Sequence, residues 1–172
     1  MKKALTIRAA KSTAANPDFL GVDVGGVLVD RIRADGSDTS FFSDRFLETP
    51  AVEGAFETLA RLGRERFGQR ICIVSKCGPK VEEKTRLWLA HHKILDALGL
   101  DARALHFCRE RRDKGPICKR LRVTHFIDDR MDVLTHLTSV PHRFLFGPQK
   151  AGVNADGVVR AETWDAIAAA LL

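Results

Sequence analysis

Polar and charged residues recur where short apolar runs of this chain end. Asp23 lies in "FLGVDV", Ser75 ends "RICIVS", and Asp128 and Asp129 end "THFIDD". Lys114 stands just before the helical pattern that leads to the last of these runs. A carboxylate in an apolar segment costs free energy unless a partner compensates it. Carboxylates, a hydroxyl and an ammonium group are together suited to bind a divalent cation and a phosphate.

The elements that would position these residues are alternating strands and helices. Five apolar runs have the length of buried strands: residues 19–24, 70–75, 104–108, 124–129 and 142–147. Helical patterns cover residues 51–67, 78–95, 115–122, 131–139 and 161–172. This alternation predicts an α/β protein, a three-layer α/β/α open parallel sheet of Rossmann-like type. Ligands of such sheets bind beyond the carboxyl ends of the strands, so the polar residues are expected at one edge.

Length and composition fit one globular domain. The chain has 172 residues, of which 45% are hydrophobic and 29% charged. Residues 1–17 carry four basic residues and no acid, without the apolar core of a secretory signal. We therefore expect an N-terminal extension over 1–17 and a single domain over 18–172. The four cysteines form no C-x-x-C pair, which favours reduced thiols in a cytoplasmic protein.

The net charge of +6 favours phosphate-bearing or otherwise acidic partners. The densest basic run, residues 109–122, has seven basic and two acidic residues, a pattern typical of a solvated helix face. It contains no aromatic residue and matches no nucleic-acid-binding module. No apolar run approaches the roughly 20 residues of a membrane helix. We expect a small phosphorylated substrate, no nucleic acid and no membrane; the oligomeric state stays open.

Asp23 with Asp128 or Asp129 would supply oxygen ligands of the kind that Mg²⁺ prefers, and the cation would relieve their mutual repulsion. Asp23 can then attack a bound phosphate as a nucleophile. Ser75 would hydrogen-bond a phosphoryl oxygen, and Lys114 would offset negative charge. Each residue also has an ordinary structural interpretation: a turn aspartate, a strand-end serine, a surface lysine and a helix N-cap.

Four segments in order resemble the haloacid dehalogenase-like superfamily of hydrolases. "DVGGVLVD" is similar to its first motif, "ICIVSKCG" to the second, "DKGPICKRL" to the third and "THFIDDRMDVL" to the fourth. The resemblance spans residues 19 to 147 and implies a phosphatase-type hydrolase with Mg²⁺. It implies catalytic roles for Asp23, Ser75 and Lys114, and metal binding by Asp23, the Gly25 carbonyl, Asp128 and Asp129. Gly26 and Lys76 are the expected substrate-binding residues.

One position departs from the family pattern. Phosphatases of this superfamily carry a second aspartate two residues after the nucleophile, where it protonates the leaving group and then activates water. Here that residue is Gly25, which cannot move a proton. Acid–base assistance is worth typically 10²–10⁴-fold in rate, so turnover is expected to be slow. The alternatives are a reaction in which the substrate supplies the proton, and a non-catalytic module that binds a phosphate ligand or a protein.

The segment between the first strand and the first helix is short. Residues 31–50 are too few for a helical cap domain with linkers, so we expect a short hairpin flap. Phe41, Phe42 and Phe46 would line the entrance of the site, or would pack the flap onto the sheet.

Overall fold

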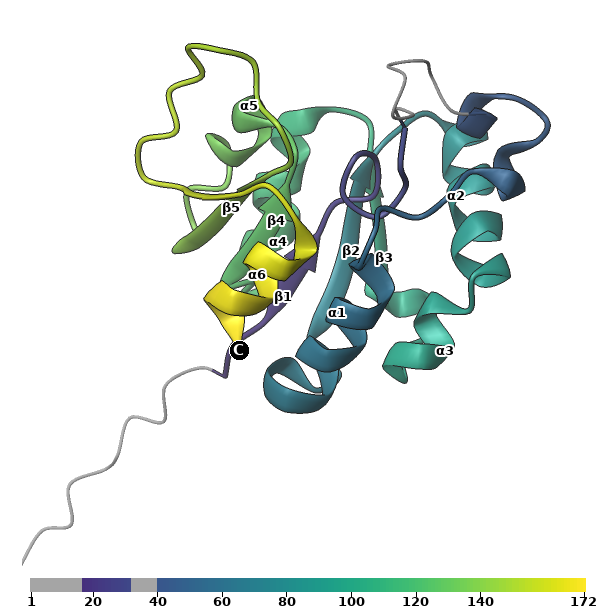
Figure 1. Cartoon of the computed structure of the whole chain (residues 1–172), viewed down its shortest axis with the longest axis horizontal. Coiled ribbons are helices and arrows are strands. Elements are labelled where there is room, and N and C mark those ends of the chain that lie inside the picture. The colour runs from purple at the N-terminus through teal and green to yellow at the C-terminus, as the bar shows by residue number, and fades with distance from the viewer. Residues whose placement is uncertain (1–16, 32–39) are drawn as a thin grey trace, which may run out of the picture.

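The computed structural model describes residues 17–31 and 40–172. They form a six-stranded parallel sheet in the order β3-β2-β1-β4-β5-β6 (Figure 1). The strands are β1 Leu20–Val22, β2 Ile71–Lys76, β3 Leu105–Cys108, β4 His125–Asp128, β5 His142–Phe146 and β6 Val159–Ala161. The prediction of an open three-layer α/β sheet is confirmed.

Helices cover both faces of the sheet. One core packs against α1 Ala55–Leu62, α2 Pro79–His91, α3 Ile94–Leu98 and α6 Trp164–Leu171. The other core packs against α4 Lys114–Leu121 and α5 Met131–Leu134. Figure 1 shows α1 and α6 side by side on their face. Within the described ranges, no helix is both long and apolar enough to cross a membrane.

The central strand β1 sets the register of the site. Val22 pairs with Ile73 of β2 and with Ile127 of β4. Because β1 and β4 are parallel and paired in this register, Asp23 and Asp128 lie next to each other at the carboxyl ends of the two strands. A Cβ atom on Gly21 would lie 2.4 Å from the ring of Phe126, so close packing requires glycine there.

The five predicted strands are present, but three elements differ from the predictions. β6 was missed, because it is a three-residue edge strand with two exposed residues, and its last residue begins the pattern that favours helix from 161. The predicted helix 78–95 is divided in two, since Lys93 has a left-handed backbone conformation (φ 53°). The predicted helix 131–139 ends at Leu134.

The described part of the predicted flap contains no strand. It forms two 3₁₀ turns, η1 Ser40–Phe42 and η2 Phe46–Glu48. Phe41 is buried against Trp88, with ring centroids 6.5 Å apart, and Phe46 packs against the core. Phe42 is 54% exposed. The rest of the predicted hairpin, residues 32–39, and the predicted extension up to residue 16 lie outside the described residues.

Candidate active site

A cavity of about 280 Å³ lies at the carboxyl end of the sheet. Its wall brings together all the residues predicted for catalysis and metal binding: Asp23, Gly25, Ser75, Lys114, Asp128 and Asp129. Asp23 follows β1, Ser75 lies near the end of β2, and Asp128 ends β4. Lys76, predicted for substrate binding, lines the same cavity. The strand-end rule therefore located one common site from residues up to 106 positions apart in the sequence.

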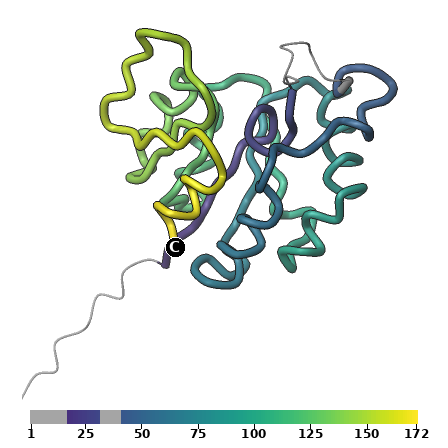
Figure 2. The backbone as a smooth tube through the Cα atoms, viewed as in Figure 1, coloured from purple at the N-terminus to yellow at the C-terminus, as the bar shows by residue number. Residues whose placement is uncertain are grey.

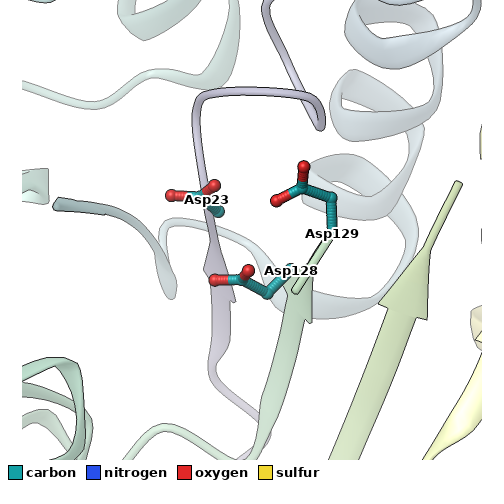
Figure 3. A group of neighbouring side chains, drawn as sticks. All are labelled: Asp23, Asp128 and Asp129. Atoms are coloured by element: carbon teal, nitrogen blue, oxygen red, sulfur yellow. The ribbon is translucent and has the colours of Figure 1, made fainter. Parts of the chain in front are cut away.

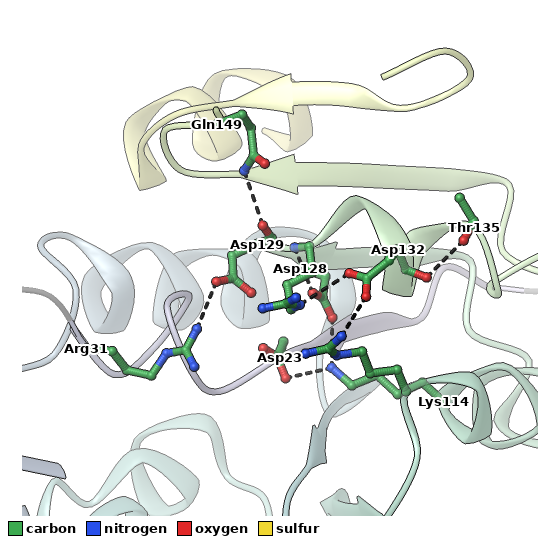
Figure 4. A network of polar contacts seen from close by, with 10 residues as sticks. Asp23, Arg31, Lys114, Asp128, Asp129, Asp132, Thr135 and Gln149 are labelled. Carbon is green, nitrogen blue, oxygen red and sulfur yellow. Dashed lines mark hydrogen bonds and ion pairs between the residues drawn. The ribbon is translucent and has the colours of Figure 1, made fainter. Parts of the chain in front are cut away.

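Lys114 connects the two buried carboxylates. Its Nζ atom donates to Asp23 Oδ1 at 2.6 Å and to Asp128 Oδ2 at 2.7 Å (Figure 4). Burial lowers the pKa of Lys114, but the charges of Asp23 and Asp128 outweigh burial and raise the pKa above its ordinary value. The ammonium group therefore stays charged inside the protein. A solvated position for this lysine, one of the ordinary interpretations, is wrong because only 2% of its side chain is exposed.

Asp128 is fully buried, and both of its oxygens are hydrogen-bonded. Oδ2 accepts from Lys114, and Oδ1 accepts from the Arg130 backbone N–H at 3.0 Å. Burial and then the nearby charge of Asp23 raise the pKa of Asp128, while Lys114 opposes them. Two carboxylates this close repel each other, and added positive charge favours their ionised forms.

Asp23, Asp128 and Asp129 lie close together, and one carboxylate oxygen from each lies within 4.8 Å of the others (Figure 3). Asp129 Oδ2 accepts from Arg31 at 3.1 Å. Its Oδ1 atom is buried and has no hydrogen-bond partner among the described residues. A buried oxygen without a partner costs free energy that a bound cation would recover. The three carboxylates thus fit a hard divalent cation such as Mg²⁺.

A tight loop after β1 carries the glycines of the site (Figure 2). The Val24 carbonyl accepts from the N–H groups of Leu28 and Val29, at 2.8 and 2.9 Å. The Trp164 indole of α6 donates to the Val27 carbonyl at 2.9 Å, which fixes the loop against the helix layer.

Gly26 has a structural role in this loop. Its φ of +79° favours glycine, and a Cβ atom would lie 2.4 Å from Asp129 Oδ2. Its N–H donates to the Val29 carbonyl at 2.9 Å, so this amide is engaged within the loop. The glycine allows the loop to close over Asp129.

Gly25 faces the side chain of Arg31. Its φ is not in the left-handed region, so the backbone itself would accept another residue. A Cβ atom there would lie 3.0 Å from Arg31 Nε and 3.2 Å from Arg31 Cδ. A guanidinium group thus lies beside the position that a side chain at residue 25 would take.

Three arginines that the sequence pattern did not predict also line the cavity: Arg31, Arg111 and Arg130. Arg111 donates to Asp132 at 2.8 Å. For Arg111 the density of charge in residues 109–122 was a usable signal, although the run was interpreted as a solvated helix face. Arg31 gave no signal, because its position depends on how the loop returns.

Cys77 also lines the cavity. Burial, followed by the charge of Glu82, raises the pKa of its thiol, so the nucleophilic thiolate is scarce at neutral pH. No histidine lines the cavity in the described part of the chain, so Ser75 has no imidazole base beside it.

No protein-family model and no curated protein sequence matches this chain.

Proposed function

We propose that the protein is a Mg²⁺-dependent phosphohydrolase or phosphotransferase that works through an aspartyl-phosphate on Asp23. The observation that carries this proposal is the buried Lys114 ammonium between Asp23 and Asp128, on a cavity wall that also includes Ser75. The resemblance of four ordered segments to the haloacid dehalogenase-like superfamily agrees with it.

In the first step, a carboxylate oxygen of Asp23 forms a bond to the phosphorus atom. The bond from phosphorus to the leaving oxygen breaks, and the electron pair stays on that oxygen. Lys114 holds the carboxylate in place by its hydrogen bond to Oδ1 and limits the build-up of negative charge. Ser75 lines the cavity, and its hydroxyl would donate to a phosphoryl oxygen.

A magnesium ion held by Asp23, Asp128, Asp129 and the Gly25 carbonyl would supply positive charge against the phosphate and the carboxylates. The unpartnered Asp129 Oδ1 supports this ligand set. In the second step, water attacks the phosphorus atom, the bond to Asp23 breaks, and inorganic phosphate leaves with the carboxylate restored. Gly25 offers no base to accept a proton from the attacking water, so this second step is slow.

A second candidate function is a non-catalytic module that binds a phosphorylated ligand. The observation that favours it is the Arg31 side chain beside Gly25, where a proton-transferring group would otherwise be expected. Cationic residues on the wall support ligand binding equally under both candidates. The two functions differ in whether Asp23 becomes phosphorylated.

Rapid-mixing kinetics with 4-nitrophenyl phosphate and Mg²⁺ tests the proposal. We expect a burst of nitrophenolate close to one equivalent per active site, followed by slow turnover. Asp23→Asn abolishes the burst, whereas Asp96→Asn, an exposed carboxylate on α3, retains it. Calorimetry on the same proteins is expected to show Mg²⁺ binding that is weakened in Asp23→Asn only. Ligand binding without release of nitrophenolate in any variant would favour the non-catalytic module.

A further inference from the structure

The group beside Gly25 limits which leaving groups the site can release. Arg31 fills the space that a side chain at Gly25 would enter, and it lines the same cavity as Asp23. A guanidinium stays protonated in proteins and does not deliver its proton to a leaving oxygen. It can only stabilise an oxygen that leaves as an anion. Alkoxide leaving groups need a proton, whereas phosphate leaves readily as an anion.

The wall of the cavity has more cationic than anionic side chains. Five cations line it (Arg31, Lys76, Arg111, Lys114 and Arg130) against three carboxylates (Asp23, Asp128 and Asp129). Lys76 is exposed and has no side-chain hydrogen bond or ion pair within residues 17–31 and 40–172. An exposed ammonium group on the wall of this cavity is available to an anionic ligand group beyond the one that Asp23 attacks.

A second, more open cavity of about 590 Å³ adjoins the first. Lys76 and Arg111 line both cavities, and Arg112 and His136 add further basic groups to the second. The negative side chains there are Glu110 and Asp132, and Asp132 is paired with Arg111 and Arg130. A ligand that extends from Asp23 toward the second cavity therefore meets Lys76 and Arg111, which line both cavities.

We propose that the substrate is a phosphoric anhydride, in which a second phosphate is the leaving group. This inference rests on the proposed function of Asp23. Asp23 forms a bond to the terminal phosphorus, the bridging P–O bond breaks, and its electron pair stays on the leaving phosphate. Arg31, Lys76 and Arg111 compensate the charge of this phosphate. No proton is transferred in this step, which makes the absence of an acid at Gly25 harmless to it.

Three probes separate leaving groups: inorganic pyrophosphate, 4-nitrophenyl phosphate and glycerol 3-phosphate. All three form the same phosphoenzyme, so kcat/KM reports the first step, in which the leaving group departs. We expect kcat/KM for pyrophosphate to exceed that for glycerol phosphate by at least about 10²-fold, the size of missing acid assistance. Equal values for pyrophosphate and the alkyl ester would overturn the inference.

Variants of the cationic wall separate binding of a second phosphate from intrinsic reactivity. Lys76→Ala is expected to lower kcat/KM for pyrophosphate about 10-fold, because one charge-assisted hydrogen bond to the second phosphate is lost. The decrease in kcat/KM for the aryl ester should be smaller. Arg31→Ala should act in the same direction, with partial recovery in Arg31→Lys. Lys119→Ala, an exposed lysine on α4, is the matched control and changes neither value.

The outcomes distinguish this inference from the proposed function. If Arg31→Ala proves unstable, Lys76→Ala still decides, because Lys76 contributes no side-chain hydrogen bond or ion pair to the described fold. Equal decreases in kcat/KM for pyrophosphate and for the aryl ester in Lys76→Ala would refute the proposal that the substrate is an anhydride. The same proposal would be refuted if the aryl ester reacts at Asp23 and pyrophosphate does not react, but the proposed function would then still hold. Failure of every probe to phosphorylate Asp23 would remove both.

Discussion

His125 begins β4 and Asp128 ends it, and these two residues belong to buried polar clusters of opposite character. The clusters are only one strand length apart and share the same sheet. At the amino end the polar atoms satisfy one another around a neutral ring. At the carboxyl end charges are concentrated around a cavity, and one buried oxygen has no partner in the described chain.

At the amino end, the geometry fixes the protonation of His125. Arg66 lies 3.3 Å from Nε2 and can only donate, so Nε2 is the accepting nitrogen. Nδ1 therefore carries the proton and donates to Thr124 Oγ1 at 2.8 Å. The ring stacks on His142 with centroids 4.4 Å apart. Burial, and then the charge of His142, lower the pKa of His125 to about 4, so the imidazole stays neutral at pH 7.

At the carboxyl end, Lys114 is charged and joins two carboxylates. Such an arrangement is weak evidence for stability, because removing charges from water is costly. The comparison teaches that burial of polar groups alone does not mark a functional site. Concentrated charge, an unpartnered acceptor and an adjoining cavity do so together.

The largest effect is expected for Lys114→Met. It leaves Asp23 and Asp128 buried without their cation, which should lower the free energy of unfolding by about 3–5 kcal/mol at pH 7. Phosphoryl transfer should fall below detection. Lys114 opposes the rise in the pKa of Asp128, so its loss raises that pKa further, and the deficit shrinks as the pH falls through the wild-type value of about 8. Denaturant unfolding at several pH values measures this.

A matched control is Lys119→Met on the same helix, which should leave stability and activity close to wild type. Wild-type activity in Lys114→Met would contradict the assignment of the carboxyl end as the reactive end.

The next largest effect is the acid dependence of the free energy of unfolding, which we attribute to His125 at the amino end of β4. The folded pKa of His125 is about 4, below its ordinary value of 6.5, so the unfolded chain binds more protons between these values. The free energy of unfolding should therefore fall as the pH drops through this window, by up to about 3 kcal/mol from this residue. Thermal unfolding between pH 4 and pH 7 measures the slope.

His125→Gln is the control for that slope. The variant starts from a lower stability, because the ring contacts are lost, but its dependence on acid should be shallower. The phosphoryl-transfer rate at pH 7 should not change. An unaltered slope would mean that other groups, such as His106, govern the acid response.

Much of the carboxyl end could be predicted from the sequence, because strand-end residues of parallel sheets meet at one edge. Asp23, Ser75, Lys114, Asp128 and Asp129 are each attached to an apolar run or helix that the pattern defines. The role of Arg31 could not be predicted, since it lies beyond a loop whose closure depends on the φ of Gly26 and on Trp164. β6 was missed for a related reason: two of its three residues are exposed, so burial imposed no strand pattern.

A gain of function at Gly25 is the third test. Gly25→Asp is permitted by the backbone, but its Cβ would meet Arg31 Nε at 3.0 Å, and the guanidinium would bind the new carboxylate. We therefore expect little gain from Gly25→Asp alone. In combination with Arg31→Ala, hydrolysis of glycerol 3-phosphate should rise about 10²-fold. Steady-state phosphate release compares the two variants.

The pair of variants tests whether Arg31 controls the position beside Gly25 at the carboxyl end of the sheet. A rise in Gly25→Asp alone, equal to that in the double variant, would show that Arg31 does not control the position. A rise in neither would show that more than the acid is missing.

The smallest effect is expected for Thr163→Ala, because Thr163 is an uncharged residue that belongs to neither buried polar cluster. Thr163 Oγ1 accepts from the Ala166 N–H at 3.2 Å and caps α6. Its loss should lower the free energy of unfolding by about 1 kcal/mol. Because Trp164 of α6 also holds the loop that carries Gly25, a change in kcat without further loss of stability would link the cap to the site. Paired unfolding and kinetic measurements resolve this.

The chemical nature of the phosphoenzyme tests the central claim most directly. After brief reaction with ³²P-labelled pyrophosphate or aryl phosphate and an acid quench, peptide mapping locates the label. If Asp23 is the nucleophile, the label lies on the peptide that contains Asp23, is released by hydroxylamine as an acyl phosphate is, and is absent in Asp23→Asn. Label on the Ser75 peptide that resists hydroxylamine, or label that persists in Asp23→Asn, would exclude Asp23 as the nucleophile.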